Sequence, residues 1–314
     1  MTAGHQVTAG AAAAATIGAH AYFEGEVVPI EAASVSIATH ALNYGTSVFE
    51  GIRAYLQEDG RTALLFGPEH YVRMLRNARL LRSSVPETAE ALVEITLELL
   101  RRNAHGGDVY IRPLIYKSAP NIRVQLTGLE DRVAIFTMPL GDYLPTGGVR
   151  LTVSAWQRVS DNAIPARGKI SGSYVNAALA AEDAHAGGYD DAILLTSDGH
   201  VAEASAANIF VVSGGEVATP PLTDDVLPGI TRGAIMTIAR DAGYEVVERR
   251  IDRSELYVAD EAFLTGTGVQ VAPIASIDDR PLADAFPVAL DIQRRYFAAV
   301  RGTDPRYAHW LTHI

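Results

Sequence analysis

The chain has 314 residues and a net charge of −11 at pH 7, which argues against nucleic acid or an anionic membrane as its main partner. It has no cysteine, so disulfides, thiol catalysis and cysteine metal sites are excluded, and its nine histidines form no close ligand pair, so we predict no metal. No apolar run approaches the roughly 20 residues of a membrane span, and the alanine tract 11–15 lacks the basic flank of a signal peptide, so we expect a cytoplasmic enzyme.

Strand-like and helix-like segments alternate along the first half of the chain. Residues 1–18 are rich in Ala, Gly and Thr and are predicted to form a disordered tail. The segments that follow are typical of a hairpin, two amphipathic helices and two branched apolar strands, predicted over residues 21–28, 67–81, 86–104, 109–116 and 132–138. Gly106-Gly107 is expected to end the second helix.

The run 140–148 is dense in turn-forming residues and is the best candidate for a domain boundary. Beyond it we predict strands over 150–156, 209–212, 245–251 and 261–264, helices over 175–186 and 231–242, and hairpin turns at 197–199 and 213–215. This mixture predicts an α+β fold with a small domain (19–140), an interdomain loop (141–149) and a large domain (150–314). The chemistry is expected in the cleft between the two domains.

Lys169 is the first candidate for chemistry, because the chain has only two lysines, Lys117 and Lys169, against twenty-four arginines. A lysine is retained where a guanidinium cannot act, and forming a Schiff base needs an amine that can lose its proton. Lys169 lies in a small, glycine-bearing run (166–174) that leads into a predicted helix. The count alone leaves open that this lysine is a chance survivor.

The run 227–234 opens the predicted helix 231–242, and the free amides at a helix start form an anion site. Ile230 and Thr231 would contribute amides, and Thr231 also a hydroxyl. The alternative is an ordinary threonine N-cap.

Glu203 follows a predicted turn and lies among small residues, so it is either a surface charge or a buried acid. A buried acid needs a cationic partner, and a protonated pyridine nitrogen would be one.

Six motifs in this order resemble the class IV pyridoxal-phosphate aminotransferases, and in particular the branched-chain amino acid aminotransferases. They are residues 40–53, 110–115, Lys169 with Tyr174, 203–210, 227–232 and 263–268. The resemblance implies a two-domain fold-type IV enzyme of the aminodeoxychorismate lyase and branched-chain aminotransferase kind. It also implies pyridoxal 5′-phosphate as cofactor and a homodimer or higher homo-oligomer that completes the site.

The resemblance also implies roles at the cofactor. Lys169 would bind it covalently and shuttle the proton between the substrate Cα and the cofactor C4′, Glu203 would pair with the ring nitrogen, and Tyr174 would lie near the phenolic oxygen. The residues expected to clasp the phosphate are Arg73, Ile230, Thr231 and Thr267.

For the substrate, the resemblance implies that Tyr110 and Arg112 position the α-carboxylate. The backbone N–H groups of the turn Gly266, Thr267 and Gly268 would assist them. The expected aromatic wall of the side-chain pocket is Tyr44, Phe49 and Tyr143, with Tyr44 at or near a subunit interface. Tyr44 and Phe49 can also be read as core aromatics.

The chain departs from the family at three places. The segment 117–128 lacks the usual glycine- and asparagine-rich loop, Ala207 stands where many relatives carry an acid, and Ser171-Gly172-Ser173 replaces a more glycine-rich run. Arg123 within that first segment has two readings, an arginine above the pocket that accepts a second carboxylate or an exposed loop arginine.

The predicted function is transfer of an amino group between branched-chain L-amino acids (Leu, Ile, Val) and 2-oxoglutarate by a ping-pong mechanism. Its alternatives are a relaxed-range class IV transaminase that also takes D-amino acids or (R)-primary amines, an aminodeoxychorismate-lyase-type lyase, and a non-catalytic binding protein. The Tyr110 and Arg112 pair favours the first, because an enzyme for amines without a carboxylate has no use for it.

Overall fold

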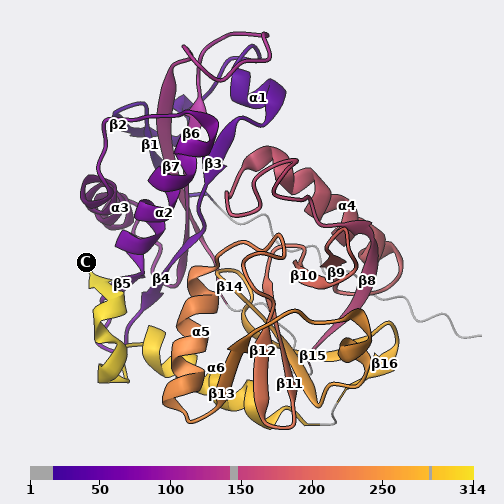
Figure 1. Cartoon of the computed structure of the whole chain (residues 1–314). Helices are drawn as coiled ribbons and strands as arrows, with labels where there is room; N and C mark the ends of the chain where they lie inside the picture. The colour runs from indigo at the N-terminus through magenta and orange to yellow at the C-terminus, as the bar shows by residue number, and fades with distance from the viewer. Residues whose placement is uncertain (1–16, 142–147, 283–284) are drawn as a thin grey trace, which may run out of the picture.

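The computed structural model describes residues 17–141, 148–282 and 285–314, which form two β-sheets with helices packed on them (Figure 1). In the part of the chain that it describes, no helix is long and apolar enough to cross a membrane.

The first sheet is antiparallel and is built mainly from the first half of the chain. Its strands follow the order β17 (Leu311–His313), β5 (Thr62–Leu65), β4 (Ile52–Leu56), β6 (Val109–Lys117), β7 (Asp131–Pro139), β1 (His20–Phe23) and β2 (Glu26–Pro29), and β3 (Ser47–Phe49) pairs with β6. Helices α2 (Gly67–Ala78) and α3 (Ala89–Asn103) pack against it, and the short helix α1 (His40–Tyr44) lies at its far end (Figure 1).

The second sheet is mixed, with β8–β9, β8–β15 and β12–β13 parallel. Its strands follow the order β10 (Val201–Ala204), β9 (Asp191–Leu195), β8 (Val149–Gln157), β15 (Gln270–Ile277), β14 (Glu261–Gly266), β11 (Asn208–Ser213), β12 (Glu216–Thr219) and β13 (Glu245–Glu248), and β16 (Arg280–Pro281) pairs with β15. Helix α4 (Tyr174–Ala186) packs on β8 and β9, while α5 (Ile230–Asp241) and α6 (Pro287–Val300) pack on β14.

Most elements predicted from the sequence are confirmed, including the first hairpin (β1–β2) and the hairpins that turn at 197–199 and 213–215. The second helix, predicted over 86–104, runs from Ala89 to Asn103, and the left-handed Ala104 is its C-cap. Gly106 also has a positive φ, but it lies two residues beyond that cap. Side chains along strand β6 alternate between its two faces. Val109, Ile111 and Ile115 are buried on one face, so Tyr110 and Arg112 point to the other.

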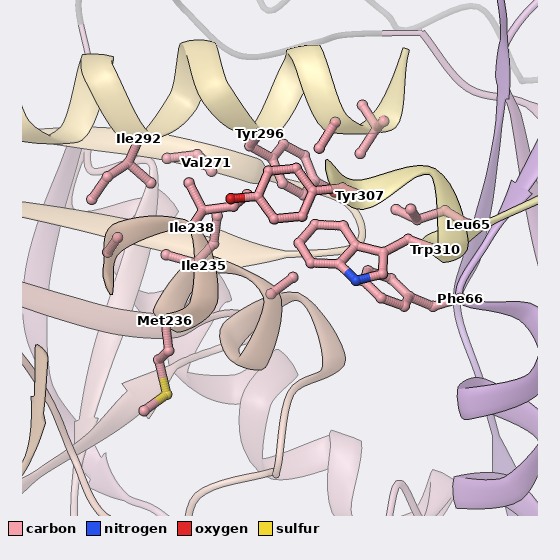
Figure 2. Close-up of a cluster of buried hydrophobic side chains, with 14 of the residues drawn as sticks. Leu65, Phe66, Ile235, Met236, Ile238, Val271, Ile292, Tyr296, Tyr307 and Trp310 are labelled. Carbon is pink, nitrogen blue, oxygen red and sulfur yellow. The ribbon is translucent and has the colours of Figure 1, made fainter. Parts of the chain in front are cut away.

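The end of the chain departs from the predicted division into 19–140 and 150–314. After α6 and a 3-10 helix (Pro305–Trp310), strand β17 pairs with β5 of the first sheet (Figure 1). Trp310 packs between Tyr307, with ring centroids 4.4 Å apart, and Phe66, at 4.8 Å (Figure 2). Phe66 directly follows β5 of the first sheet, and Ile235 of the same cluster lies in α5, which packs on the second sheet. This core therefore joins the two sheets with their helices and fixes the cleft between them.

Candidate active site

A cavity of about 540 Å³ is lined by residues from both sheets and by the segment that carries Lys169. Twelve of the fourteen residues predicted from the sequence line it. They are Phe49, Arg73, Tyr110, Arg112, Lys169, Tyr174, Glu203, Ile230, Thr231, Gly266, Thr267 and Gly268. The described residues therefore bring together nearly all of the site residues that the sequence predicted.

Lys169 is held between the two units. Its carbonyl accepts a hydrogen bond from the Phe49 amide (3.0 Å), and its Nζ donates to the Tyr174 hydroxyl (2.5 Å). The amine lies 4.8 Å from the centre of the Phe49 ring. Just after the lysine, the Gly172 amide donates to the Gly45 carbonyl (3.1 Å), and a Cβ on Gly45 would lie 2.6 Å from the Gly172 Cα. Glycine at position 45 thus lets the lysine segment pack closely against the turn between α1 and β3.

Glu203 is buried and has its own protein partners. Its Oε1 lies 2.8 Å from Nη2 of Arg158, and its Oε2 accepts from Asn208 Nδ2 (2.9 Å) and the Leu227 amide (3.1 Å). Burial raises the pKa of Glu203, and the nearby Arg158 guanidinium opposes that rise. The alternative that Glu203 is a surface charge is therefore wrong. As a buried acid it needs a cationic partner, and in this structure that partner is Arg158.

Helix α5 begins at Ile230, and its N-cap is Gly229. No side chain caps this end, and Thr231 is the second residue inside the helix, so the reading of Thr231 as an ordinary N-cap is wrong. Ile230 and Thr231, the first residues of α5, line the cavity. The backbone N–H groups at this helix start have no partner within the helix, so they form a site that can bind an anion.

Arg73 reaches the same cavity from α2, and its guanidinium is fixed by two groups. Glu50 accepts from its Nε (2.7 Å) and Nη2 (2.6 Å), and the Pro228 carbonyl accepts from Nη1 (2.7 Å). His70 Nδ1 lies 2.8 Å from the Glu50 carboxylate. Burial acts to raise the pKa of Glu50, yet Arg73 and His70 together lower it to about 2, so Glu50 is ionised at neutral pH.

Arg112 and Tyr110 form a pair at the cavity. Arg112 donates from Nη2 (2.6 Å) and Nε (3.1 Å) to the Tyr110 hydroxyl, and its guanidinium lies 4.5 Å from the centre of the Phe49 ring. Thr267 donates its hydroxyl proton to the Gly51 carbonyl (2.9 Å). In this arrangement Thr267 offers an incoming anion its amide rather than its hydroxyl proton.

Two of the predicted wall residues are not brought to the cavity. Tyr44 is 41% exposed, does not line the cavity, and donates its hydroxyl to the Ile122 carbonyl (2.5 Å). Tyr143 lies outside the described residues. Arg123 is exposed and lies away from this chain's cavity, with its carbonyl bound by His40 Nε2 (3.0 Å). Within one chain, Arg123 is therefore an exposed loop arginine.

Sequence reasoning missed Glu50, His70, Arg158 and Asn208. Glu50 and Asn208 lie inside two of the quoted motifs, and this position was the only sequence signal for a role at the site. Arg158 follows a strand, and no sequence pattern indicates a role for it.

The donor set fits a phosphorylated aromatic aldehyde such as pyridoxal 5′-phosphate. An amine, a buried carboxylate, a guanidinium and a helix N-terminus all face one cavity of suitable volume. Thr265 also lines the cavity, and its hydroxyl is buried and without a hydrogen-bond partner. A bound group with polar atoms would satisfy such a hydroxyl.

Comparison with known proteins agrees with this site. Residues 47–277 match the family model described as Amino-transferase class IV. The chain is 46% identical over 299 residues to the probable branched-chain-amino-acid aminotransferase of Aquifex aeolicus, covering 94% of this chain and 96% of that one. It is 35% identical over 300 residues to the branched-chain-amino-acid aminotransferase of Escherichia coli K12, covering 93% and 96%.

Solved structures of similar sequence have the same fold. The branched-chain aminotransferase of Thermoproteus uzoniensis with norvaline superposes with a TM-score of 0.92 at 41% identity, covering 94% of this chain and 99% of that one. The branched-chain amino acid aminotransferase of Thermobaculum terrenum in its PLP-form (holo-form) gives 0.90 at 32% identity, covering 95% and 98%. The chain therefore belongs to the amino-transferase class IV family and is a fold-type IV transaminase.

Proposed function

We propose that this transaminase uses pyridoxal 5′-phosphate, bound covalently through Lys169, to exchange amino groups between branched-chain L-amino acids and 2-oxoglutarate by a ping-pong mechanism. The observation that carries the proposal is the presence in one cavity of the Lys169 amine, the buried Glu203 carboxylate and the anion-binding start of α5. The names of the relatives support the branched-chain substrate class.

Each residue has a defined task in this proposal. When bound, the cofactor supplies an electron sink for the charge that develops at the substrate Cα. The Lys169 amine then takes the proton from the substrate Cα and delivers it to the cofactor C4′. Tyr174 orients that amine through their hydrogen bond. Glu203 keeps the ring nitrogen protonated. The phosphate is held by Arg73, the amides of Ile230, Thr231 and Thr267, and the hydroxyl of Thr231.

The lining of the cavity supports an α-amino acid with an apolar side chain. Arg112 offers a guanidinium to the α-carboxylate, with Tyr110 holding it in place and the backbone of Gly266 to Gly268 nearby. Leu114 and Val269 add apolar surface to Phe49 at the same cavity. Hydrocarbon side chains therefore suit the remaining space better than charged ones.

A relaxed-range transaminase is the second candidate, because Arg123 and Tyr44 lie away from the cavity of the single chain and do not narrow it. A homodimer or higher homo-oligomer that completes the wall is part of the proposal, with Tyr44 and Tyr143 as its expected aromatic members. A cytoplasmic location remains an expectation.

The proposal is tested by half-reactions. The holoenzyme is mixed separately with L-leucine, L-glutamate, D-alanine and (R)-1-phenylethylamine, and loss of the visible cofactor absorbance is followed for wild type and Arg112→Ala. We expect fast reactions with L-leucine and L-glutamate. Arg112→Ala should slow them about ten- to a hundredfold, the cost of one charge-assisted hydrogen bond, while the amine without a carboxylate is little affected.

Three results would contradict the assignment. A wild-type enzyme that reacts faster with D-alanine or the amine than with L-leucine belongs to the relaxed-range class. Equal slowing of all substrates by Arg112→Ala would make Arg112 a structural residue and remove the argument for an α-carboxylate site. Aminodeoxychorismate is added as a fifth compound, and release of pyruvate from it without net conversion of the cofactor would identify a lyase.

A further inference from the structure

Glu50 is a completely buried carboxylate beside the cavity that none of the roles above uses. It directly follows β3, and its relative exposure is 0%. Both of its oxygens face Arg73, at 2.7 Å from Nε and 2.6 Å from Nη2, which is the two-point geometry in which a carboxylate fixes the plane of a guanidinium. The orientation of Arg73 is therefore set by Glu50.

The hydrogen bonds of Arg73 leave part of its guanidinium free for the cavity. Of the five N–H groups of an arginine, Glu50 takes two and the Pro228 carbonyl takes a third. The two that remain lie on the terminal nitrogens of a side chain that lines the cavity. Pro228 directly precedes Gly229, the N-cap of α5, so the same guanidinium is also tied to the helix start.

His70 completes the arrangement from one turn earlier on α2. A carboxylate only accepts hydrogen bonds, so His70 Nδ1 at 2.8 Å from Glu50 carries the proton. Burial lowers the pKa of His70, although Glu50 opposes that change, and the ring is therefore neutral. The group of Glu50, Arg73 and His70 then has no net charge, and Arg73 binds an anion through fixed donors rather than through excess charge.

We propose that Glu50 is a positioning residue for the phosphate group of the cofactor, acting through Arg73 by holding its two free N–H groups toward the anion site at the start of α5. This inference rests on the proposed function, in which Arg73 binds that phosphate. A carboxylate that merely pins α2 to β3 would stabilise the protein but would not distinguish a phosphorylated ligand from the same ligand without phosphate.

The test compares two ligands that differ only in the phosphate. Dissociation constants of pyridoxal 5′-phosphate and of pyridoxal are measured by absorbance titration of the apoenzyme, for wild type and Glu50→Gln. The preference for the phosphorylated ligand should fall at least about tenfold in Glu50→Gln, the worth of one charge-assisted hydrogen bond, while the pyridoxal constant stays unchanged. An unchanged preference overturns the inference.

Glu261→Gln is the matched control. Glu261 is also a buried carboxylate, and it accepts from the amides of Val288 and Ala289 (3.0 Å each) at the start of α6, away from the cavity. This variant should lose stability and keep the wild-type preference between the two ligands. If its preference falls as far as that of Glu50→Gln, the effect reports general loosening and the inference is wrong.

Glu50→Gln leaves Arg73 buried without its anion, which can prevent folding. The double variant Arg73→Gln/Glu50→Gln removes both charges and is compared with Arg73→Gln alone. Because Glu50 acts through Arg73, the double variant should lose no preference beyond the loss seen in Arg73→Gln, and a further fall in the double variant overturns the inference.

The underlying phosphate site is tested separately. If wild type binds both ligands equally, or if Arg73→Gln keeps the wild-type preference, Arg73 does not bind the phosphate and the proposed function loses that contact.

Discussion

Replacing Gly51 by alanine should damage substrate binding although it removes no polar group from the cavity. Gly51 lies at the cavity between β3 and β4, and a Cβ built on it would meet the Tyr110 hydroxyl oxygen at 2.4 Å and the ring carbon Cζ at 3.0 Å. Ordinary contact begins at 3.4 Å, so the hydroxyl must retreat by about 1 Å. The Tyr110 ring and its hydroxyl oxygen form one rigid group, so the new methyl group shifts both together.

The retreat breaks the bond that holds Arg112. The Nη2 to hydroxyl distance of 2.6 Å would grow to roughly 3.6 Å if the oxygen moved directly away, which is beyond hydrogen-bonding distance. Losing one charge-assisted bond, and with it the placing of the guanidinium, costs about 1.5 to 3 kcal/mol. We expect kcat/KM for L-leucine to fall about ten- to a hundredfold.

The assay is the half-reaction with L-leucine at a series of concentrations, beside retention of the cofactor on dialysis. Gly107→Ala is the matched control, because Gly107 has no atom within 4 Å of its Cβ position and needs no left-handed backbone. Wild-type kinetics in Gly51→Ala would refute the reasoning, since the Tyr110 to Arg112 bond would then be dispensable. Loss of the cofactor on dialysis would show that the methyl group disturbs another part of the site.

Lys169→Arg should abolish transamination while the protein stays folded by circular dichroism, and turnover above about a thousandth of wild type would contradict a covalent role. Glu203→Gln should retain the cofactor but slow proton removal in single-turnover kinetics, whereas Thr231→Ala should weaken cofactor retention by about 0.5 to 1.5 kcal/mol in dialysis; exchanged phenotypes would mean that the two ends of the site are reversed. Because the pKa of Glu50 is lowered from 4.5 to about 2, its stabilising contribution is complete above pH 4.5 and is lost as the pH falls toward 2. The difference in unfolding free energy between wild type and Glu50→Gln, measured in urea, should therefore shrink by about 3 kcal/mol from about pH 5 to about pH 2, and a constant difference would contradict the ionised Glu50.

Local features of this chain are readable from the sequence because their causes lie within a few residues. The turns at 197–199 and 213–215 are set by glycine and polar side chains inside the turn, and both hairpins form as predicted. The helix after Lys169 begins at Tyr174 and runs to Ala186, as its small residues favour. The alternation along β6 alone aims Tyr110 and Arg112 at the same face.

Chain ends and short strands were harder to predict, because their stability comes from distant neighbours. The strands β3, β4 and β5 have three to five residues each and little local pattern, and they are stable because they pair with each other or with β6. Strand β17 depends on the pairing of Leu311 with Leu65, 246 positions away. No window of sequence contains both partners.

The chemical groups of this protein and, through six ordered motifs, the family it resembles can be read from its residues alone. Which group faces which depends on the folded chain. The fold pairs Glu203 with Arg158, 45 positions away, and Glu50 with Arg73, 23 positions away on another element. It also places Tyr44 against Ile122 rather than at the cavity of its own chain. The reason is physical, because a charge is buried only where the folded backbone brings it a partner, and no local pattern records that pairing.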